Sequence, residues 1–137
     1  MATFAGRNQA VKIGSNTVVG MGKWSIEGVS IDQIDTSAFG TVWKTFDAGM
    51  VDGGTVSFDG YYDATDTNGQ TLLIAANTAG THLTSIRFYI NNTSYYIPEY
   101  TTQGSFIIMT GYTLTADKAD VARISFTGKI SGYCTLI

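Results

Sequence analysis

The stretch VARISFTGKI, residues 121–130, carries the clearest periodic pattern in the chain. Apolar residues or glycine occupy every second position, namely Ala122, Ile124, Phe126, Gly128 and Ile130. Polar or charged residues stand between them, namely Arg123, Ser125, Thr127 and Lys129. A period of two predicts a β-strand with one dry face and one polar face.

Similar alternation recurs in shorter segments, so strands are expected to dominate the fold. It is found at Val56–Phe58, at Ile86–Ile90, and from Phe106 to Leu114 with an interruption at Gly111. The segment from Lys23 to Ile31 changes phase at Gly28, where we expect a β-bulge. Turn residues separate the segments near Asn16, at Asn91–Thr93 and at Asp117–Asp120, which predicts hairpins.

The composition fits one folded domain spanning residues 1–137. Apolar residues make up 44% and charged residues only 14%, with 16 glycines, which is typical of a turn-rich β protein. A weakly charged surface suits burial against identical neighbours. The single cysteine, Cys134, excludes an intrachain disulfide.

No targeting or membrane signal stands out. The N-terminal stretch lacks an apolar signal core, and no run approaches the roughly 18 apolar residues of a membrane span. We therefore expect the chain to fold in a cytosol, without a membrane partner.

The net charge of −3 is unevenly distributed. Residues 32–66 hold seven acids against Lys44, a balance of −6, while the remainder holds four acids against seven bases, or +3. The acidic stretch is either a solvated loop or a face that meets an oppositely charged face of another copy. Neither interpretation supports a nucleic-acid-binding surface, which needs a concentration of basic residues.

The string D-x-N-G at residues 66–69 invites a comparison with a calcium loop. If Gly69 is taken as the invariant glycine, Asp66 and Asn68 fit the pattern. The first ligand position is then Ala64 and the twelfth is Ala75, so the first and the bidentate ligands are both missing. No metal is expected there.

A helix explains the same region better. Asp63 can cap the helix, with Asp66 in capping-box spacing, and Asp66 is an alternative start. An apolar stripe follows at residues 72–76, and Gly80 ends the element. The sequence therefore predicts a mainly β fold, a β-sandwich or barrel with one flanking α-helix.

The sequence contains no set of residues typical of a catalytic site. His82 and Cys134 are the only residues of their kinds, and nothing in the sequence places a base beside the thiol. Metal sites need clusters of ligands, and no glycine-rich phosphate loop follows a strand. We expect no enzyme activity, no metal and no cofactor.

Residues 32–53 form a long segment with weak periodicity, which we expect to be a loop. Loops of this length usually have a function or are disordered. Its apolar side chains either fold back on the domain core or contact a partner, and an exposed apolar set implies a partner. Trp43 and Phe46 are the natural anchors of such a contact.

The chain resembles the tail tube proteins of long-tailed bacteriophages. The resemblance rests on residues 11–73 and on the closing VARISFTGKISG, residues 121–132. Its most specific part is Asp32-Gln33-Ile34-Asp35-Thr36-Ser37, followed by Phe39-Gly40 and Trp43.

The resemblance implies a structural virion protein in the phage tail, assembled in the host cytoplasm. Six copies would form a ring, and rings would stack into a hollow tube that conducts DNA without binding it specifically. The long loop would reach the neighbouring ring, and the interface residues would be Ile34, Phe39, Val42, Trp43, Phe46 and Met50. Further partners would be the tail initiator or baseplate, the tape measure and the tail terminator proteins.

An alternative function is a small β-sandwich module that binds carbohydrate or a cell surface. It would use exposed aromatic side chains, for which the candidates are Tyr61, Tyr62, Tyr95, Tyr96 and Tyr100.

Overall fold

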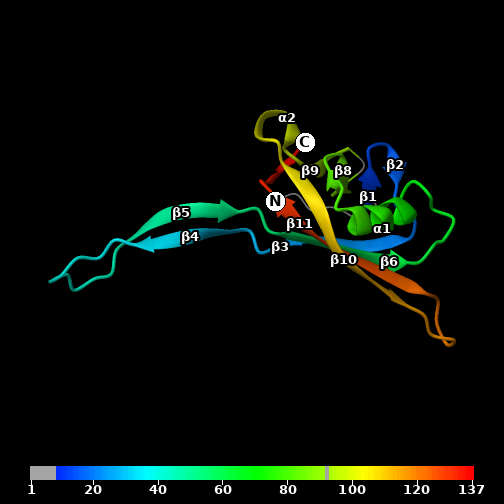
Figure 1. Ribbon diagram of the computed structural model, residues 1–137, viewed down its shortest axis with the longest axis horizontal. Helices are drawn as coiled ribbons and strands as arrows, with labels where there is room; N and C mark the ends of the chain where they lie inside the picture. Colours follow the sequence, from blue (N-terminus) through cyan, green and yellow to red (C-terminus); the bar gives the residue numbers. More distant parts are fainter. Residues whose placement is uncertain (1–8, 92) are drawn as a thin grey trace.

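The computed structural model describes residues 9–91 and 93–137, and these form two packed sheets and a projecting ribbon. Each of the packed sheets has five strands, and a separate two-stranded ribbon extends far from this body (Figure 1). The architecture is mainly β with one main helix, as the sequence predicts. A four-residue helix, α2 (Tyr100–Gln103), was not expected from the sequence.

The first sheet has the strand order β12-β9-β8-β1-β2, with all neighbours antiparallel. Its strands are β1 (Ala10–Ile13), β2 (Asn16–Thr17), β8 (Ile86–Tyr89), β9 (Tyr95–Pro98) and β12 (Cys134–Leu136). The predicted hairpins β1–β2 and β8–β9 are confirmed by their pairing. Asn92, in the second of these turns, lies outside the described residues.

The second sheet has the order β3-β6-β11-β10-β7 and is also antiparallel. Its strands are β3 (Met21–Glu27), β6 (Thr55–Tyr61), β7 (His82–Leu83), β10 (Phe106–Thr115) and β11 (Arg123–Ser131). The alternation of apolar and polar residues predicted for residues 121–130 is confirmed in β11. Ile124, Phe126 and Ile130 are buried, whereas Arg123 and Lys129 are exposed.

Aromatic side chains join the two sheets across the core. The ring of Phe88 in β8 lies 5.5 Å from that of Trp24 in β3 and 5.8 Å from that of Phe58 in β6. Phe58 in turn stacks on Phe126 at 5.2 Å. The indole Nε1 of Trp24 donates a hydrogen bond of 3.0 Å to the carbonyl of Tyr89. This one side chain therefore joins the two sheets both by packing and by a hydrogen bond.

Two phase changes in the sequence have different structural causes. The β-bulge expected at Gly28 is wrong, because β3 ends at Glu27 and a strand of the separate ribbon begins at Ser30. Gly28 has a φ of 74°, a conformation that suits glycine and turns the chain out of the sheet. A true bulge lies in β10 between Met109 and Gly111.

The bulge decides which residues of β10 face the core. Before it, Ile107 and Met109 are buried, not the alternating Phe106 and Ile108 that the sequence pattern suggested. After it, the phase has shifted, and Tyr112 lies opposite the buried Phe126.

The main helix, α1 (Gln70–Ala79), begins later than the sequence predicted. Asp63 does not cap it, because its carboxylate accepts hydrogen bonds from the backbone and hydroxyl of Thr65 instead. Asp66 lies beside the first turn, where its Oδ2 accepts from the amide of Gln70 at 3.1 Å. Gly80 ends the helix in the left-handed conformation, as expected.

Gln70 explains why the helix starts where it does. Its side chain is fully buried, and its Nε2 donates to the carbonyls of Val19 and Tyr61 at 2.6 and 2.7 Å. Its Oε1 accepts from the amide of Asp63 at 2.9 Å. The buried amide group therefore joins the helix to the β2–β3 turn and to the end of β6, and both its nitrogen and its oxygen have hydrogen-bond partners.

The segment expected as a loop over residues 32–53 is instead mostly strand. β4 (Ser30–Asp35) pairs with β5 (Phe46–Asp52) in an antiparallel ribbon, and only residues 36–45 connect them. Figure 1 shows this ribbon extending from the body to one end of the molecule. The expectation of a loop over this whole segment was therefore wrong.

Replacing Gln70 by leucine should destabilise the fold strongly. The substitution leaves two carbonyls and one amide without their buried partner, and we expect a loss of about 2–4 kcal/mol in the free energy of unfolding. Urea denaturation measures this loss. The neighbouring Thr71→Ala, at an exposed position of the same helix, should change it by less than about 0.5 kcal/mol. Equal effects of both substitutions would contradict the role given to the amide.

Candidate assembly surface

The ribbon presents apolar side chains that the body of the protein does not cover. Phe39, Val42, Trp43 and Met50 each expose at least 82% of their surface, and Ile34 and Phe46 expose 53% and 54%. These are the six residues that the sequence analysis singled out, and the structure brings them together on one projection. The alternative in which the segment folds back on its own core is wrong.

The pairing register places apolar side chains on both faces of the ribbon. Ile31 lies opposite Val51, and the register shift between Ile31 and Gln33 puts Phe46 on the same face as Val51. The other face carries Ile34 together with the carboxylates of Asp47 and Asp52. The position of Ile31 across from Val51 follows only from the register, so the sequence alone does not reveal it.

Polar groups brace the connecting loop at the far end of the ribbon. Asp35 Oδ1 accepts from the amide of Ser37 at 2.8 Å, and this bond lowers the pKa of Asp35. The hydroxyl of Ser37 accepts from the amide of Thr45 at 2.9 Å, and the hydroxyls of Thr36 and Thr45 lie 2.9 Å apart. The motif Asp35-Thr36-Ser37 thus satisfies the loop's polar groups internally, while the apolar side chains beyond it stay exposed.

The root of the ribbon is fixed to the second sheet. The ammonium of Lys129 in β11 pairs with the carboxylate of Asp52 and donates to the carbonyl of Gly54 at 3.2 Å. Asp52 also accepts from the amide of Gly54 at 2.8 Å. Gly53 packs so closely on β11 that an added Cβ would lie 2.0 Å from the carbonyl oxygen of Gly132. These contacts set the direction in which the ribbon leaves the body.

An apolar pocket lies beside this root, between the ribbon and the body. Its volume is about 460 Å³. Both sheets and the ribbon contribute to its wall, which consists of Trp24, Ile26, Val29, Val51, Gly53, Tyr96, Tyr133 and Cys134. Burial raises the pKa of Cys134 to about 11, so the thiol is protonated at neutral pH and acts here as an apolar wall.

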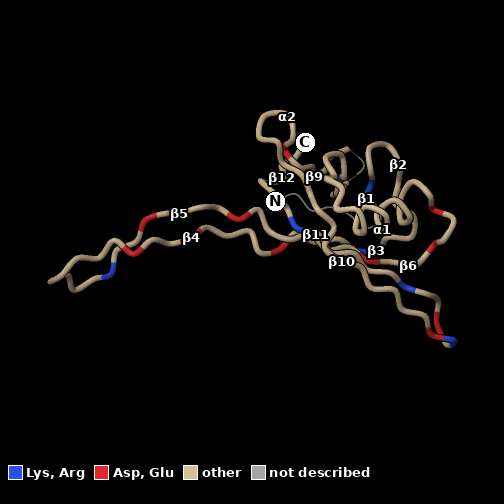
Figure 2. The backbone as a smooth tube through the Cα atoms, in the orientation of Figure 1, with Lys and Arg blue, Asp and Glu red and all other residues tan. Residues whose placement is uncertain are grey.

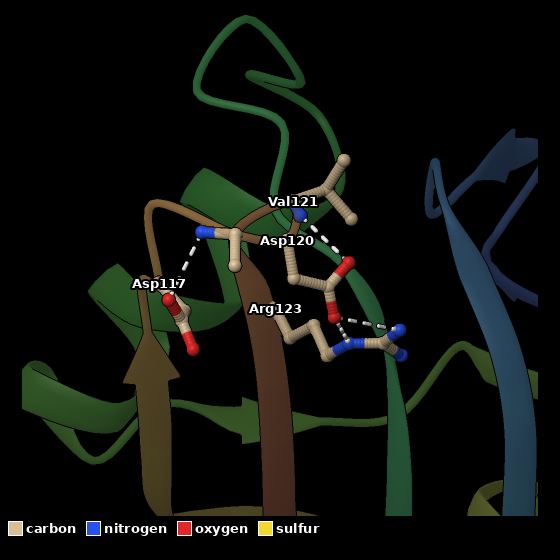
Figure 3. A network of polar contacts seen from close by, with 5 residues as sticks. Asp117, Asp120, Val121 and Arg123 are labelled. Atoms are coloured by element: carbon tan, nitrogen blue, oxygen red, sulfur yellow. Dashed lines mark hydrogen bonds and ion pairs between the residues drawn. The ribbon is translucent and has the colours of Figure 1, made fainter.

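The hairpin of β10 and β11 forms a second, shorter projection. Its turn is organised by Asp117, which accepts from the amide of Ala119, and by Asp120, which accepts from the amide of Val121 (Figure 3). Asp120 also pairs with Arg123 at 3.3 Å, and both contacts lower its pKa. Figure 2 shows the clustered charges at this end of the molecule.

The outward face of the second sheet is polar across β3, β6 and β11, whereas β10 adds Phe106 and Ile108 to it. Its charged side chains nearly balance, with three bases and two acids on β3, β6 and β11: Lys23, Arg123, Lys129, Glu27 and Asp59. Between them the hydroxyls of Ser25 and Ser57 lie 2.8 Å apart. Of the acidic residues in the stretch 32–66, Asp59 is on this face, whereas Asp32, Asp35, Asp47 and Asp52 are on the ribbon.

The same sheet has two open edges. Within residues 9–91 and 93–137, no strand pairs with the outer edge of β3, and β7 covers β10 only at Ile107 and Ile108. The rest of β10, residues 109–115, presents free backbone groups on that side. Open edges of this kind are templates for pairing with another strand.

The five tyrosines of the carbohydrate-binding alternative do not form one exposed platform. Tyr96 packs against the core beside Trp24, and Tyr95 lies under the guanidinium of Arg87. Tyr61 is in the other sheet, under Arg123. The structure therefore separates residues that this function would need side by side.

The residues considered for chemistry are also apart. His82, in β7 of the second sheet, stacks on Phe106 at 3.8 Å, whereas Cys134 is in β12 of the first sheet. In the part of the chain that the structure describes, no group of three or more histidine, cysteine or carboxylate side chains could hold a metal ion. Across the same residues, no helix is long and apolar enough to span a membrane.

Comparison with known proteins identifies the fold. No protein-family model matches the chain, and no curated protein matches it in sequence. A chain from the tail of an empty gene transfer agent particle, a structure with C6 symmetry, matches with a TM-score of 0.72 and 14% identity. That match covers 97% of this chain and 98% of the other.

Chains from an extracellular contractile injection system match as well. One from the sheath–tube complex in the extended state has a TM-score of 0.64 and 13% identity, over 98% of this chain and 90% of the other. One from the sheath/tube terminator has a TM-score of 0.72 and 12% identity, over 100% and 98%. The fold is that of the tail tube proteins, and the resemblance seen in the sequence is confirmed at the level of fold.

The ion pair at the ribbon root gives a titration prediction. Lys129 and the amide of Gly54 hold the pKa of Asp52 below its ordinary value of 3.8. The stability that this carboxylate contributes is therefore fully present above pH 3.8 and is lost as the pH falls through the lowered folded pKa.

Lys129→Met should move the titration midpoint of Asp52 upward, although not fully to 3.8, because the Gly54 amide remains. NMR of the side-chain carboxyl carbon measures the midpoint. Lys23→Met, on the same sheet face, is the matched control and should leave it unchanged. An unshifted midpoint in Lys129→Met would show that the ammonium does not stabilise the carboxylate.

Proposed function

We propose that the protein is the subunit of a phage-type tail tube. Copies join side by side into six-membered rings, and the rings stack into a hollow conduit through which DNA leaves the virion. The observation that carries this proposal is the match to tail structures over nearly the whole of both chains, which includes a match in a C6-symmetric tail. The exposed apolar ribbon supports it independently.

The open sheet edges supply a route to the ring. The outer edge of β3 in one copy can pair with residues 109–115 of β10 in the next, which extends the second sheet from copy to copy. Such a contact joins two different surfaces, and a rotation that closes it gives a cyclic ring. Every copy then has both of its edges covered.

The polar face of the second sheet suits the wall of a bore. Across β3, β6 and β11, its serine and threonine side chains and its nearly balanced charges offer DNA neither a cluster of bases nor an apolar patch. Affinity for nucleic acid comes mainly from bases that neutralise phosphates, so a balanced wall lets the strand slide. Most carboxylates of the acidic stretch then belong to the contacts between subunits and not to the bore.

The ribbon joins neighbouring rings in this proposal, through Ile34, Phe39, Val42, Trp43, Phe46 and Met50. A ribbon of two strands is marginally stable alone in water, and this one exposes apolar side chains along its length. Burial between rings removes that surface from water. Assembly in the host cytoplasm, on a tail initiator and around a tape measure until a terminator binds, completes the proposed function. We assign no catalytic role and no cofactor.

Removing the aromatic side chains of the ribbon loop should weaken tube assembly and leave the fold intact. In Phe39→Ser/Trp43→Ser, both changes lie outside the core, so the free energy of unfolding should stay within about 0.5 kcal/mol of the parent value. The concentration needed for assembly should rise at least about ten-fold, as for the loss of interface hot spots. Electron microscopy and sedimentation of concentrated protein measure this.

Val19→Ser is the matched control, since it removes an exposed apolar side chain from the β2–β3 turn, away from the ribbon. It should assemble like the parent. Tubes of unchanged stability from the double variant would refute the role of the loop. A parent protein that stays as single particles, even with tail-initiator proteins present, would refute the tube function itself and favour the surface-binding module.

A further inference from the structure

The chain carries an exposed apolar knob and an apolar pocket that is open to receive one. The knob is the ribbon loop, residues 36–45, with Phe39, Val42 and Trp43. The pocket is the one beside the ribbon root, with Trp24, Tyr96 and Tyr133 among its lining residues. We propose that the pocket is the receptor for the ribbon loop of a second copy, with Trp43 as the inserted side chain. The proposal rests on the proposed function and names the surface that the ribbon meets.

A loop cannot occupy the pocket of its own chain. The strands β4 (Ser30–Asp35) and β5 (Phe46–Asp52) separate the loop from the root. At the rise of an extended strand, the six residues of β4 span about 20 Å. Figure 1 shows the ribbon directed away from the body along its whole length. The Lys129–Asp52 pair and the close packing of Gly53 fix that direction. A ribbon loop that enters the pocket must therefore come from another molecule.

The pocket has the size and chemistry for a large aromatic side chain. Its volume of about 460 Å³ exceeds that of one indole, and its wall is almost wholly apolar or aromatic. Trp24 and Tyr96 are only partly buried in the free chain, although both pack against the core. An inserted ring would cover them and extend the aromatic stack that joins the sheets.

The native cysteine offers a direct test, because Cys134 lines the pocket and is the one cysteine of the chain. Val42→Cys places a second thiol beside Trp43 and keeps the indole. Assembled protein is oxidised with copper phenanthroline at about pH 9, because the thiol of Cys134 ionises poorly at neutral pH. Mass spectrometry of the digested polymer should then find a disulfide between residues 42 and 134 of different copies.

Two variants and one accessibility measurement make the test specific. Val19→Cys carries its thiol on the β2–β3 turn and should give no bond to Cys134. Adding Trp43→Ser to Val42→Cys should reduce the bond at least ten-fold. Alkylation of Cys134 in the parent protein should become at least ten-fold slower in tubes than in the dispersed protein.

The outcomes separate the receptor from the tube function. Tubes that give the 42–134 disulfide and protect Cys134 support the receptor. Tubes in which Cys134 stays freely alkylated and unlinked, or in which Val19→Cys links to it equally well, overturn the receptor and leave the tube function standing. A parent protein that forms no tube under any condition overturns both.

Discussion

The exposed apolar surface of the β4–β5 ribbon is the constraint on which the rest of the structure depends. Phe39, Val42 and Trp43 lie at the end of two strands that no other described residue covers. A two-stranded ribbon alone buries too little apolar surface to offset the entropy that its residues lose on ordering. Its root is held by the contacts of Asp52 with Lys129, and hydrogen bonds within the loop satisfy the polar groups of Asp35 and Ser37. The large apolar side chains of the loop remain exposed.

The body is built to resist deformation at that root. Trp24 packs on Phe88 and bonds the carbonyl of Tyr89, so the strand that leads into the ribbon is fixed to both sheets. On the opposite side, Gln70 and Asp66 join the helix to the turn that precedes the same strand. β3 is therefore held at its middle, by Trp24, and at the turn that precedes it.

Elements with one apolar and one polar face could be predicted from the sequence. Elements whose two faces are alike could not. β11 has one dry and one wet face, so its alternation alone locates Ile124 and Phe126 in the core. The ribbon has no such contrast, because apolar side chains such as Ile31 and Ile34 lie on both of its faces, and residues 32–53 therefore had no period to detect. The start of α1 was misplaced for another reason. Asp63 has the local chemistry of a cap, but the bonds of Gln70 to distant carbonyls decide the boundary.

The six candidate interface residues could be proposed from the sequence because they are apolar residues within one segment. The pocket beside the ribbon root could not be predicted in this way. Exposed apolar residues within one segment are visible in a sequence. A pocket assembled from Trp24, Val51, Tyr96 and Tyr133 draws on both sheets and the ribbon, and only the tertiary structure brings these residues together. The exposed loop and the pocket thus lie at opposite ends of one ribbon, and their spacing is fixed by strand length and register. If the pocket receives the loop of a second copy, as proposed, the length of the ribbon sets the distance between successive copies.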